Sequence, residues 1–139
     1  MGLRSGRAWL VRVPKGADLW EWLRAFLRGN GVHAGGVSVI GATTRAVLGF
    51  YVPQARVYRE RVVEGQREIL SCAGNVSVHE GAPFPHVHIV LGAEDGSCLG
   101  GHLRPGTTVF VGEAEIREYE GEEPVRVPDP ELGLPLWKP

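Results

Sequence analysis

Cysteine is scarce in this sequence: Cys72 and Cys98 are the only two among 139 residues. They lie far apart and form no Cys-x-x-Cys pair, so the sequence offers neither a disulfide framework nor a thiolate zinc knuckle. Phosphate-binding loops and nucleophile elbows are absent as well, and we therefore expect no organic cofactor. We expect both cysteines to be buried as small apolar residues.

The sequence also lacks long apolar runs and an excess of charge of one sign. No run approaches the roughly 20 apolar residues that span a bilayer, and the stretch from Ala8 to Val13 contains Arg12, unlike the apolar region of a signal peptide. We therefore expect a cytoplasmic protein with no membrane partner. A net charge of −1 gives no global positive field, so DNA binding would depend on a local patch or on assembly.

Length and punctuation indicate one domain, since 139 residues can bury a real core but are too few for two. We expect this domain to occupy residues 1–120. Residues 121–139 form a tail rich in Glu and Pro that cannot hold a regular element for long. The tail either extends into solvent or lies along this subunit or a neighbour through Leu134, Leu136 and Trp137.

One segment has the pattern of a helix. Asp18 can cap its start, and Gly29, Asn30 and Gly31 can end it because they tolerate the left-handed conformation. Between these ends, apolar residues recur on one helical face, which we expect to pack against a sheet. This apolar stripe consists of Leu19, Trp22, Leu23, Phe26 and Leu27.

The rest of the chain alternates short β-prone runs with Gly or Pro, which predicts about seven strands. With a single helix, most strand links cannot be βαβ crossovers, so we predict an α+β fold with a mainly antiparallel sheet and a hairpin turn at Glu94, Asp95 and Gly96. The predicted strands are Ala8–Val13, Gly36–Ile40, Arg45–Val52, Arg56–Val63, Glu68–Val78, His86–Leu91 and Thr107–Glu118.

Three histidines have the spacing of a metal site. His86 and His88 are two residues apart in a strand-like run, so both imidazoles leave the same face of the strand. His102 follows Gly100 and Gly101, where the absence of side chains lets one strand approach another closely. We predict that His86, His88 and His102 hold zinc, which favours imidazole ligands and keeps a fourth position open for water or substrate.

An ordinary structural role competes with this interpretation. A His-x-His pair also arises by chance in a chain with five histidines, and a buried histidine is often a hydrogen-bonded core residue. His79 is a weaker candidate for a fourth ligand and His33 weaker still, because each has the surroundings of a loop or helix-end residue.

Several strings together resemble the PPC (plants and prokaryotes conserved) domain family, in its prokaryotic stand-alone form. The resemblance runs in order from about Arg7 to Glu120. Its strings are Val11–Gly16, Gly36–Ala42, Leu48–Tyr51, Glu68–Ser77, His86–His88 and Gly100–Leu103.

The resemblance implies an α+β fold, assembly as a homotrimer, and a stand-alone domain often labelled a predicted DNA-binding protein. Plant members carry an AT-hook before the domain, whereas Arg4–Arg7 here is only a faint echo of that motif. The wider structural class includes acetolactate decarboxylase, whose zinc is similarly held by His-x-His and a later histidine. That analogy bears on the metal more than on a reaction.

Three functions follow as competing hypotheses. The first is a non-enzymatic, zinc-containing homotrimer with a regulatory or interaction role. The second is a small zinc enzyme acting on a carbonyl-containing small molecule, with Glu113, Glu115 and Arg104 as candidate acid/base and carboxylate-binding partners. The third is DNA binding through a patch of arginines, multiplied by the trimer. That patch would comprise Arg4, Arg7, Arg56, Arg59, Arg61 and Arg67.

Overall fold

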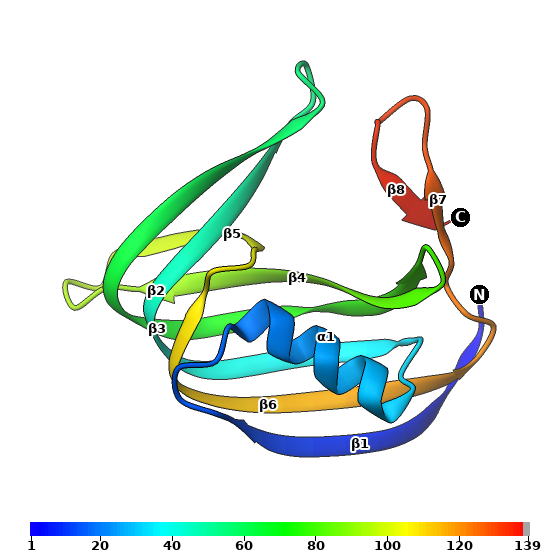
Figure 1. Cartoon of the computed structure of the whole chain (residues 1–139), viewed down its shortest axis with the longest axis horizontal. Helices are drawn as coiled ribbons and strands as arrows, with labels where there is room; N and C mark the ends of the chain where they lie inside the picture. Colours follow the sequence, from blue (N-terminus) through cyan, green and yellow to red (C-terminus); the bar gives the residue numbers. More distant parts are fainter. Residues whose placement is uncertain (138–139) are drawn as a thin grey trace.

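A six-stranded antiparallel sheet with one helix across it forms the body of the protein, and a two-stranded hairpin follows it (Figure 1). The computed structural model describes residues 1–137. Strand order in the large sheet is β1-β6-β2-β3-β4-β5, with an additional pairing of β2 and β5. The elements are β1 (Leu3–Val13), α1 (Leu19–Asn30), β2 (Gly35–Val52), β3 (Val57–His79), β4 (Ala82–Gly92), β5 (Cys98–Leu103), β6 (Thr108–Gly121), β7 (Arg126–Pro128) and β8 (Pro135–Trp137).

The helix α1 begins and ends where the sequence predicts. The Asp18 carboxylate accepts hydrogen bonds from the backbone N–H groups of Trp20 and Glu21, and Gly31 ends the helix in the left-handed conformation with φ of 65°. Leu19, Leu23 and Leu27 are buried, while the larger aromatic members of the stripe are only partly buried. The leucines belong to one core cluster with apolar residues from every strand of the large sheet, including Val13, Val39, Cys72, Ile89, Leu103 and Ile116.

Two pairs of predicted strands are in fact single long strands. The predicted breaks near Gly41 and Arg45 are shifts of register between β2 and its neighbours, not turns. A bulge accommodates an extra residue without ending a strand, and Gly41 has the positive φ of 142° that a side chain would disfavour. Punctuation by glycine therefore marked bends within β2 and β3 rather than their ends.

The strands β4 and β5 form a hairpin around the predicted turn. The Ala93 N–H donates to the Ser97 carbonyl and the Gly96 N–H donates to the Ala93 carbonyl. β5 was missing from the predicted strands, since its Gly-Gly pair carries little β propensity. The prediction of two buried cysteines is half wrong: Cys72 is buried in the core, but Cys98, at the start of β5, is exposed.

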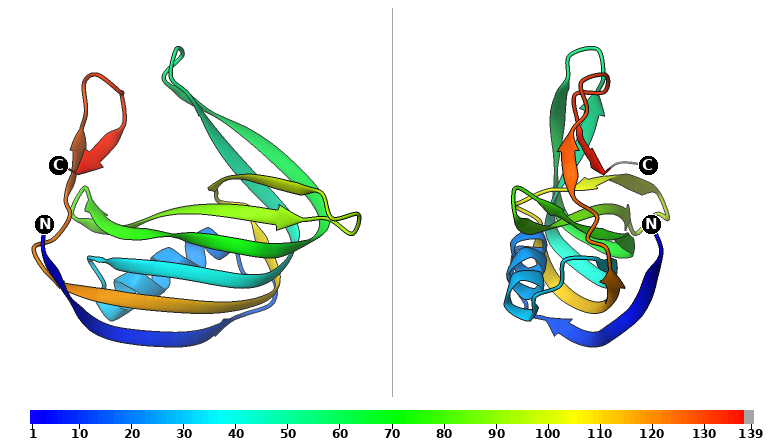
Figure 2. Two further views of the ribbon diagram at one scale, coloured as in Figure 1. Left: turned by 180° about the vertical axis from the view of Figure 1, so that it is seen from behind. Right: turned by 90° about the vertical axis from the view of Figure 1, so that its right-hand side faces the viewer.

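Two hairpins project from the body on the same side (Figures 1 and 2). One is the outer half of β2 and β3, and the other is the tail, whose strands β7 and β8 are three residues each. Their ends are joined, because the Tyr51 hydroxyl donates to the Leu132 carbonyl at 2.6 Å and Arg56 donates to the carbonyls of Pro130 and Glu131. Of the alternatives for the tail, the structure has it lying along its own subunit.

The apolar residues of the sheet are divided unequally between its two faces. The face beneath α1 holds the core, whereas Leu10, Ile40, Leu70 and Val90 remain exposed in β1 to β4. Within residues 1–137, α1 is too short and too polar to be a membrane-spanning helix, and no other helix qualifies.

Candidate metal centre

Three imidazoles converge on the side of β4 that faces away from the core. His86 and His88 lie on β4, and His102 lies directly opposite His88 in the antiparallel register of β5. One candidate ligand nitrogen from each side chain lies within 4.8 Å of the others. The ring centroids are 5.2 Å apart for His86 and His88, 5.1 Å for His86 and His102, and 4.3 Å for His88 and His102.

Glycine makes this approach of strands feasible. A Cβ atom at Gly101 would lie 2.9 Å from the Gly49 carbonyl oxygen, so any side chain there would push β5 away from β2. Gly74 in β3 plays the same part behind His86, because a Cβ atom there would collide with the His86 backbone. Both glycines therefore fix the position of a histidine through its backbone.

Burial keeps two of the histidines neutral. Burial, assisted by the nearby Arg126 guanidinium, His102 and His88, lowers the pKa of His86 to about 4. Burial also lowers the pKa of His102, assisted by His88 and Arg104. His88 is more exposed than the other two. Near neutral pH, His86 and His102 thus present unprotonated nitrogen lone pairs, the form that binds a metal.

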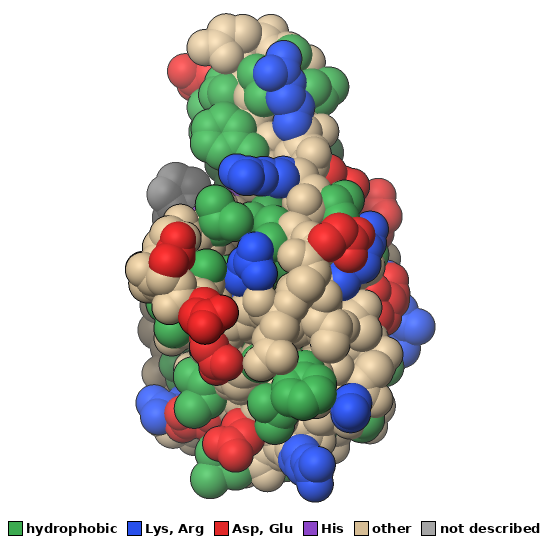
Figure 3. Space-filling model, turned by 90° about the vertical axis from the view of Figure 1, so that its left-hand side faces the viewer, with side chains coloured by type: hydrophobic (Ala, Val, Ile, Leu, Met, Phe, Trp, Pro, Cys, Tyr) green, Lys and Arg blue, Asp and Glu red, His purple; other side chains and the backbone are tan. Residues whose placement is uncertain are grey.

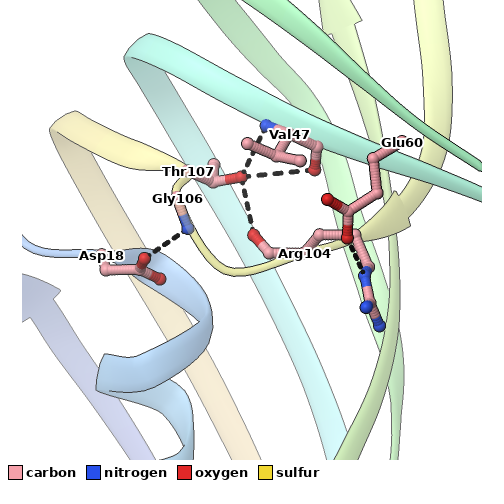
Figure 4. Close-up of polar contacts among 6 residues, drawn as sticks. All are labelled: Asp18, Val47, Glu60, Arg104, Gly106 and Thr107. Atoms are coloured by element: carbon pink, nitrogen blue, oxygen red, sulfur yellow. Dashed lines mark hydrogen bonds and ion pairs between the residues drawn. The ribbon is translucent and has the colours of Figure 1, made fainter.

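A buried threonine holds the turn that follows His102 (Figure 4). Thr107 is fully buried; its hydroxyl donates to the Arg104 carbonyl at 3.0 Å and accepts from the Val47 N–H at 3.0 Å. Asp18, the helix cap, also accepts from the Gly106 N–H. Arg104 leaves this turn and pairs with Glu60 at 2.9 Å. The start of α1 and the end of β5 are therefore tied to one another.

Arg126, in β7, is a pocket residue that the sequence analysis missed. The residue is only 7% exposed, and its guanidinium carbon lies over the rings of Phe84 and Trp137, 5.3 and 4.7 Å from their centroids. In Val125-Arg126-Val127 the usual expectation is that valines point inward and arginine outward, but the two valines are 48% and 39% exposed. No pattern in the sequence could have indicated this inversion.

Histidines, aromatic rings and Arg126 line a small cavity of about 180 Å³ between the two projecting hairpins. His86 and His102 form part of its wall, and Tyr58 contacts the His102 ring edge-on at 5.2 Å. Burial raises the pKa of Tyr58, so its hydroxyl keeps its proton. The cavity therefore opens directly onto the histidine cluster.

The remaining candidate residues lie elsewhere. His79 contacts Phe84 at 5.5 Å, and His33 is exposed with its Nδ1 2.6 Å from a Glu123 oxygen, so neither joins the cluster. Glu113 and Glu115 were candidate acid/base partners, but they line a different cavity on the outer face of the sheet. Arg104 does line the histidine pocket, as expected.

The candidate DNA-binding arginines do not form one free basic surface among residues 1–137. Arg4 and Arg7 pair with Glu120 and Glu118, and Arg56 is engaged with the tail. Figure 3 shows acidic side chains interspersed with basic ones over the end of the molecule that it presents. Arg59 and Arg61 of β3 have no ion pair within the described range, but Glu60 and Glu64 lie close by along the strand.

The donor set of the cluster suits a zinc ion. Zinc–nitrogen bonds of about 2.1 Å place two ligating nitrogens roughly 3–4 Å apart, so modest side-chain rotations would bring all three nitrogens onto one ion. The three histidines would hold the metal and leave a position open toward the cavity. There a bound metal would act as a Lewis acid or activate water.

Comparisons with known proteins support the resemblance found in the sequence. A metal-containing protein from Archaeoglobus fulgidus is 37% identical, with a TM-score of 0.93 over 99% of this chain and 97% of that one. A plant- and prokaryote-conserved (PPC) protein from Pyrococcus horikoshii is 34% identical, with a TM-score of 0.94 over 99% and 95%. A protein from Bacteroides thetaiotaomicron, named for a supposed DNA-binding role, is 27% identical, with a TM-score of 0.87 over 98% and 96%.

A curated relative is much longer than this chain. The bifunctional protein GlmU from Synechococcus sp. (strain JA-3-3Ab) is 31% identical over 134 residues, which is 93% of this chain but only 20% of that protein. The chain thus spans about a fifth of the length of that relative. The model of the Plants and Prokaryotes Conserved (PCC) domain matches residues 2–120, the whole of the large sheet and its helix apart from the last residue of β6, and the chain belongs to this family.

Proposed function

We propose that this chain is a zinc-containing PPC homotrimer with a regulatory or interaction role, in which His86, His88 and His102 are the metal ligands. One observation carries the metal assignment: three imidazole nitrogens from two paired strands lie within 4.8 Å of one another. The lowered pKa values of His86 and His102 favour the unprotonated form that zinc requires. The metal-containing relative from Archaeoglobus fulgidus adds support. In this proposal residues 1–120 are the functional domain and residues 121–139 its tail, of which the described part, up to Trp137, covers the site.

Metal analysis of the purified protein tests the ligand assignment. We expect about one zinc per chain in the wild type, a comparable content in His33→Ala, and little or none in His88→Ala. His33 is the matched control because it is exposed and lies outside the cluster. If the wild type takes up no zinc from a zinc-containing buffer, or if His88→Ala keeps it, the ligand assignment is wrong.

The outer face of the sheet supports the trimer. Leu10 is 86% exposed and Ile40 54% exposed, and with charged neighbours they line a cavity across β1, β6 and β2. Exposed apolar residues gathered on a sheet face are typical of a contact surface between subunits. We expect sedimentation to give a mass three times the 15.1 kDa of the chain, and Leu10→Glu to sediment as a monomer. A wild-type monomer at micromolar concentration would exclude the trimer.

A second candidate is a small zinc enzyme that acts on a carbonyl-containing small molecule. The cavity beside His86 and His102 favours it, because a substrate there would reach the open coordination position. Turnover of 2-acetolactate or simple esters that is lost with a chelator, and lost in His88→Ala, is the expected result. Inertness of the zinc-loaded protein over such a panel would leave the non-enzymatic function.

Association with DNA is the third function, and it rests on the names of relatives more than on this surface. The exposed arginines of β3, repeated in each subunit of the trimer, would supply the contacts with DNA phosphates. Binding through phosphates weakens steeply with salt. We therefore expect any gel shift to appear at low salt and to weaken in Arg59→Gln; its absence at low salt would exclude DNA.

A further inference from the structure

We propose that the cavity between the histidine cluster and the tail binds a small organic carboxylate, and that Arg126 is the residue that recognises it. This inference deepens the proposed function and rests on it, since His86 and His102 of the cluster line the same cavity as Arg126. It also concerns a residue outside the part of the chain that matches the family model.

The first argument is the charge of Arg126 and its surroundings. Arg126 is only 7% exposed as a residue, yet none of residues 1–137 places a carboxylate within ion-pair distance of its guanidinium. The cavity wall contains no Asp or Glu either. A buried cation is costly unless an anion or a full set of hydrogen-bond acceptors compensates it. Arg104, the other arginine of the wall, already has Glu60.

The second argument is that Nη2 of Arg126 makes only long hydrogen bonds and that one N–H of Nη1 has no acceptor among residues 1–137. A guanidinium offers five N–H groups. Short contacts use two of them, one to the Ser77 hydroxyl at 2.6 Å and one to the Pro135 carbonyl at 3.0 Å. The contacts of Nη2 with the Asn75 side-chain oxygen and His86 Nδ1 are longer, at 3.3 and 3.4 Å. A planar carboxylate could replace the long contacts of Nη2 and accept two parallel hydrogen bonds, one from Nη2 and one from the remaining N–H of Nη1.

The third argument comes from the histidines. Three imidazole ligands would leave the charge of a bound divalent ion uncompensated, and His86 Nδ1 is only 3.4 Å from Arg126 Nη2. Two cations would then face one cavity with no acidic side chain in its wall. An anion bound in the cavity beside both cations would be favoured by both. Two positive charges beside a wall without acidic side chains favour the binding of an anion over that of a neutral ligand.

The size and walls of the cavity limit the anion. A volume of about 180 Å³ is below the range of drug-sized sites, so the ligand is small. Tyr58, Phe84 and Leu136 line it, and these apolar surfaces suit a short carbon chain better than a fully hydrated inorganic phosphate. We therefore assign the anion as a short carboxylate, with phosphate as the alternative that the experiment must separate.

The test is calorimetric titration of zinc-loaded protein with pyruvate, acetate and inorganic phosphate. We expect pyruvate to bind the wild type and Arg28→Gln equally, and to bind Arg126→Gln about tenfold or more weakly, because a hydrogen bond to a charged group is lost. Zinc content should stay the same in all three proteins. Arg28 is the matched control because it is an exposed arginine in the last turn of α1.

The outcomes separate this inference from the proposed function. Equal pyruvate affinity in the wild type and Arg126→Gln, or tighter binding of phosphate than of pyruvate, would overturn the inference while zinc content still supports the metal site. A wild type without zinc would overturn the proposed function, and titration of that metal-free protein would then decide Arg126 alone. If Arg126→Gln fails to fold, Arg126→Lys replaces it: a retained charge without the planar fork should weaken pyruvate but not zinc.

Discussion

The two faces of β4 differ sharply, although their residues alternate along one strand. Val87, Ile89 and Leu91 point toward α1 and are 2%, 0% and 0% exposed. His86 and His88 point the other way, toward His102, and His86 also lines the cavity between the hairpins. One face therefore gains its free energy from dry apolar packing, while the other keeps ionisable side chains accessible. The side chains on the other face of the strand are packed in the core, and this packing holds in place the backbone that carries the histidines.

We expect the largest effect on stability from a substitution in the apolar core, which should leave the metal site intact. Leu23→Ala removes a fully buried side chain beneath α1 and should lower the free energy of unfolding by about 3 kcal/mol. Zinc content of the folded variant should stay that of the wild type. Denaturant unfolding of the metal-free protein, followed by metal analysis, checks both. Loss of zinc from a folded Leu23→Ala would mean that the two faces are not independent.

Substitution of a metal-ligand histidine should remove the metal site and leave the apolar core intact. Zinc at 100 times its dissociation constant should raise the free energy of unfolding of the wild type by about 2.7 kcal/mol but leave that of His88→Ala unchanged. The reason is that only a protein with the complete cluster binds the ion in its folded state. Thermal melts with and without zinc measure this. A full zinc response in His88→Ala would contradict the assignment of that ligand.

Asp18 contacts both the helix that covers the core and the turn next to the histidine pocket. Its substitution therefore shows whether the two regions depend on each other. It caps α1 and also accepts from the Gly106 N–H in the turn that holds Arg104 (Figure 4). Asp18→Ala should cost about 1 kcal/mol of unfolding free energy, with Asp18→Asn recovering part of it. Zinc binding should change little, because no histidine contacts Asp18. Denaturant titrations of the three proteins would show this order, and an unaltered stability of Asp18→Ala would refute the capping role.

Acid should lower the stability through protonation of His86, on the cavity side of β4, rather than through the apolar core. The pKa of His86 falls from its ordinary value of 6.5 to about 4 on folding, so the unfolded chain binds more protons between these values. Its contribution to stability is therefore present above pH 6.5 and lost as the pH falls toward 4. We expect a shallow loss of stability in the metal-free wild type over this range, and a smaller one in His86→Gln. Parallel pH profiles of the two would disprove this role for His86.

Local patterns predicted a large part of this structure. The apolar stripe located α1, and Asp18 and Gly31 fixed its ends, because capping and helical periodicity depend on neighbours in the chain. The pairing of His86 with His88 on one side of a strand followed from alternation in the same way. Two predictions were wrong. The break predicted near Gly41 is a register shift within β2 and not the end of a strand, and Cys98, predicted to be buried, is exposed.

The remaining features depend on contacts between distant segments. Alternation placed His86 and His88 on one side, but only the register of β5 against β4 put His102 opposite His88. Only the return of the tail over the pocket buried Arg126 against Phe84 and Trp137. Strand register and the position of a tail are set by packing of the whole molecule, whereas helix ends and strand faces are set by a few adjacent residues. Alternation along the chain thus sets which side chains share a face, and long-range packing sets which faces meet.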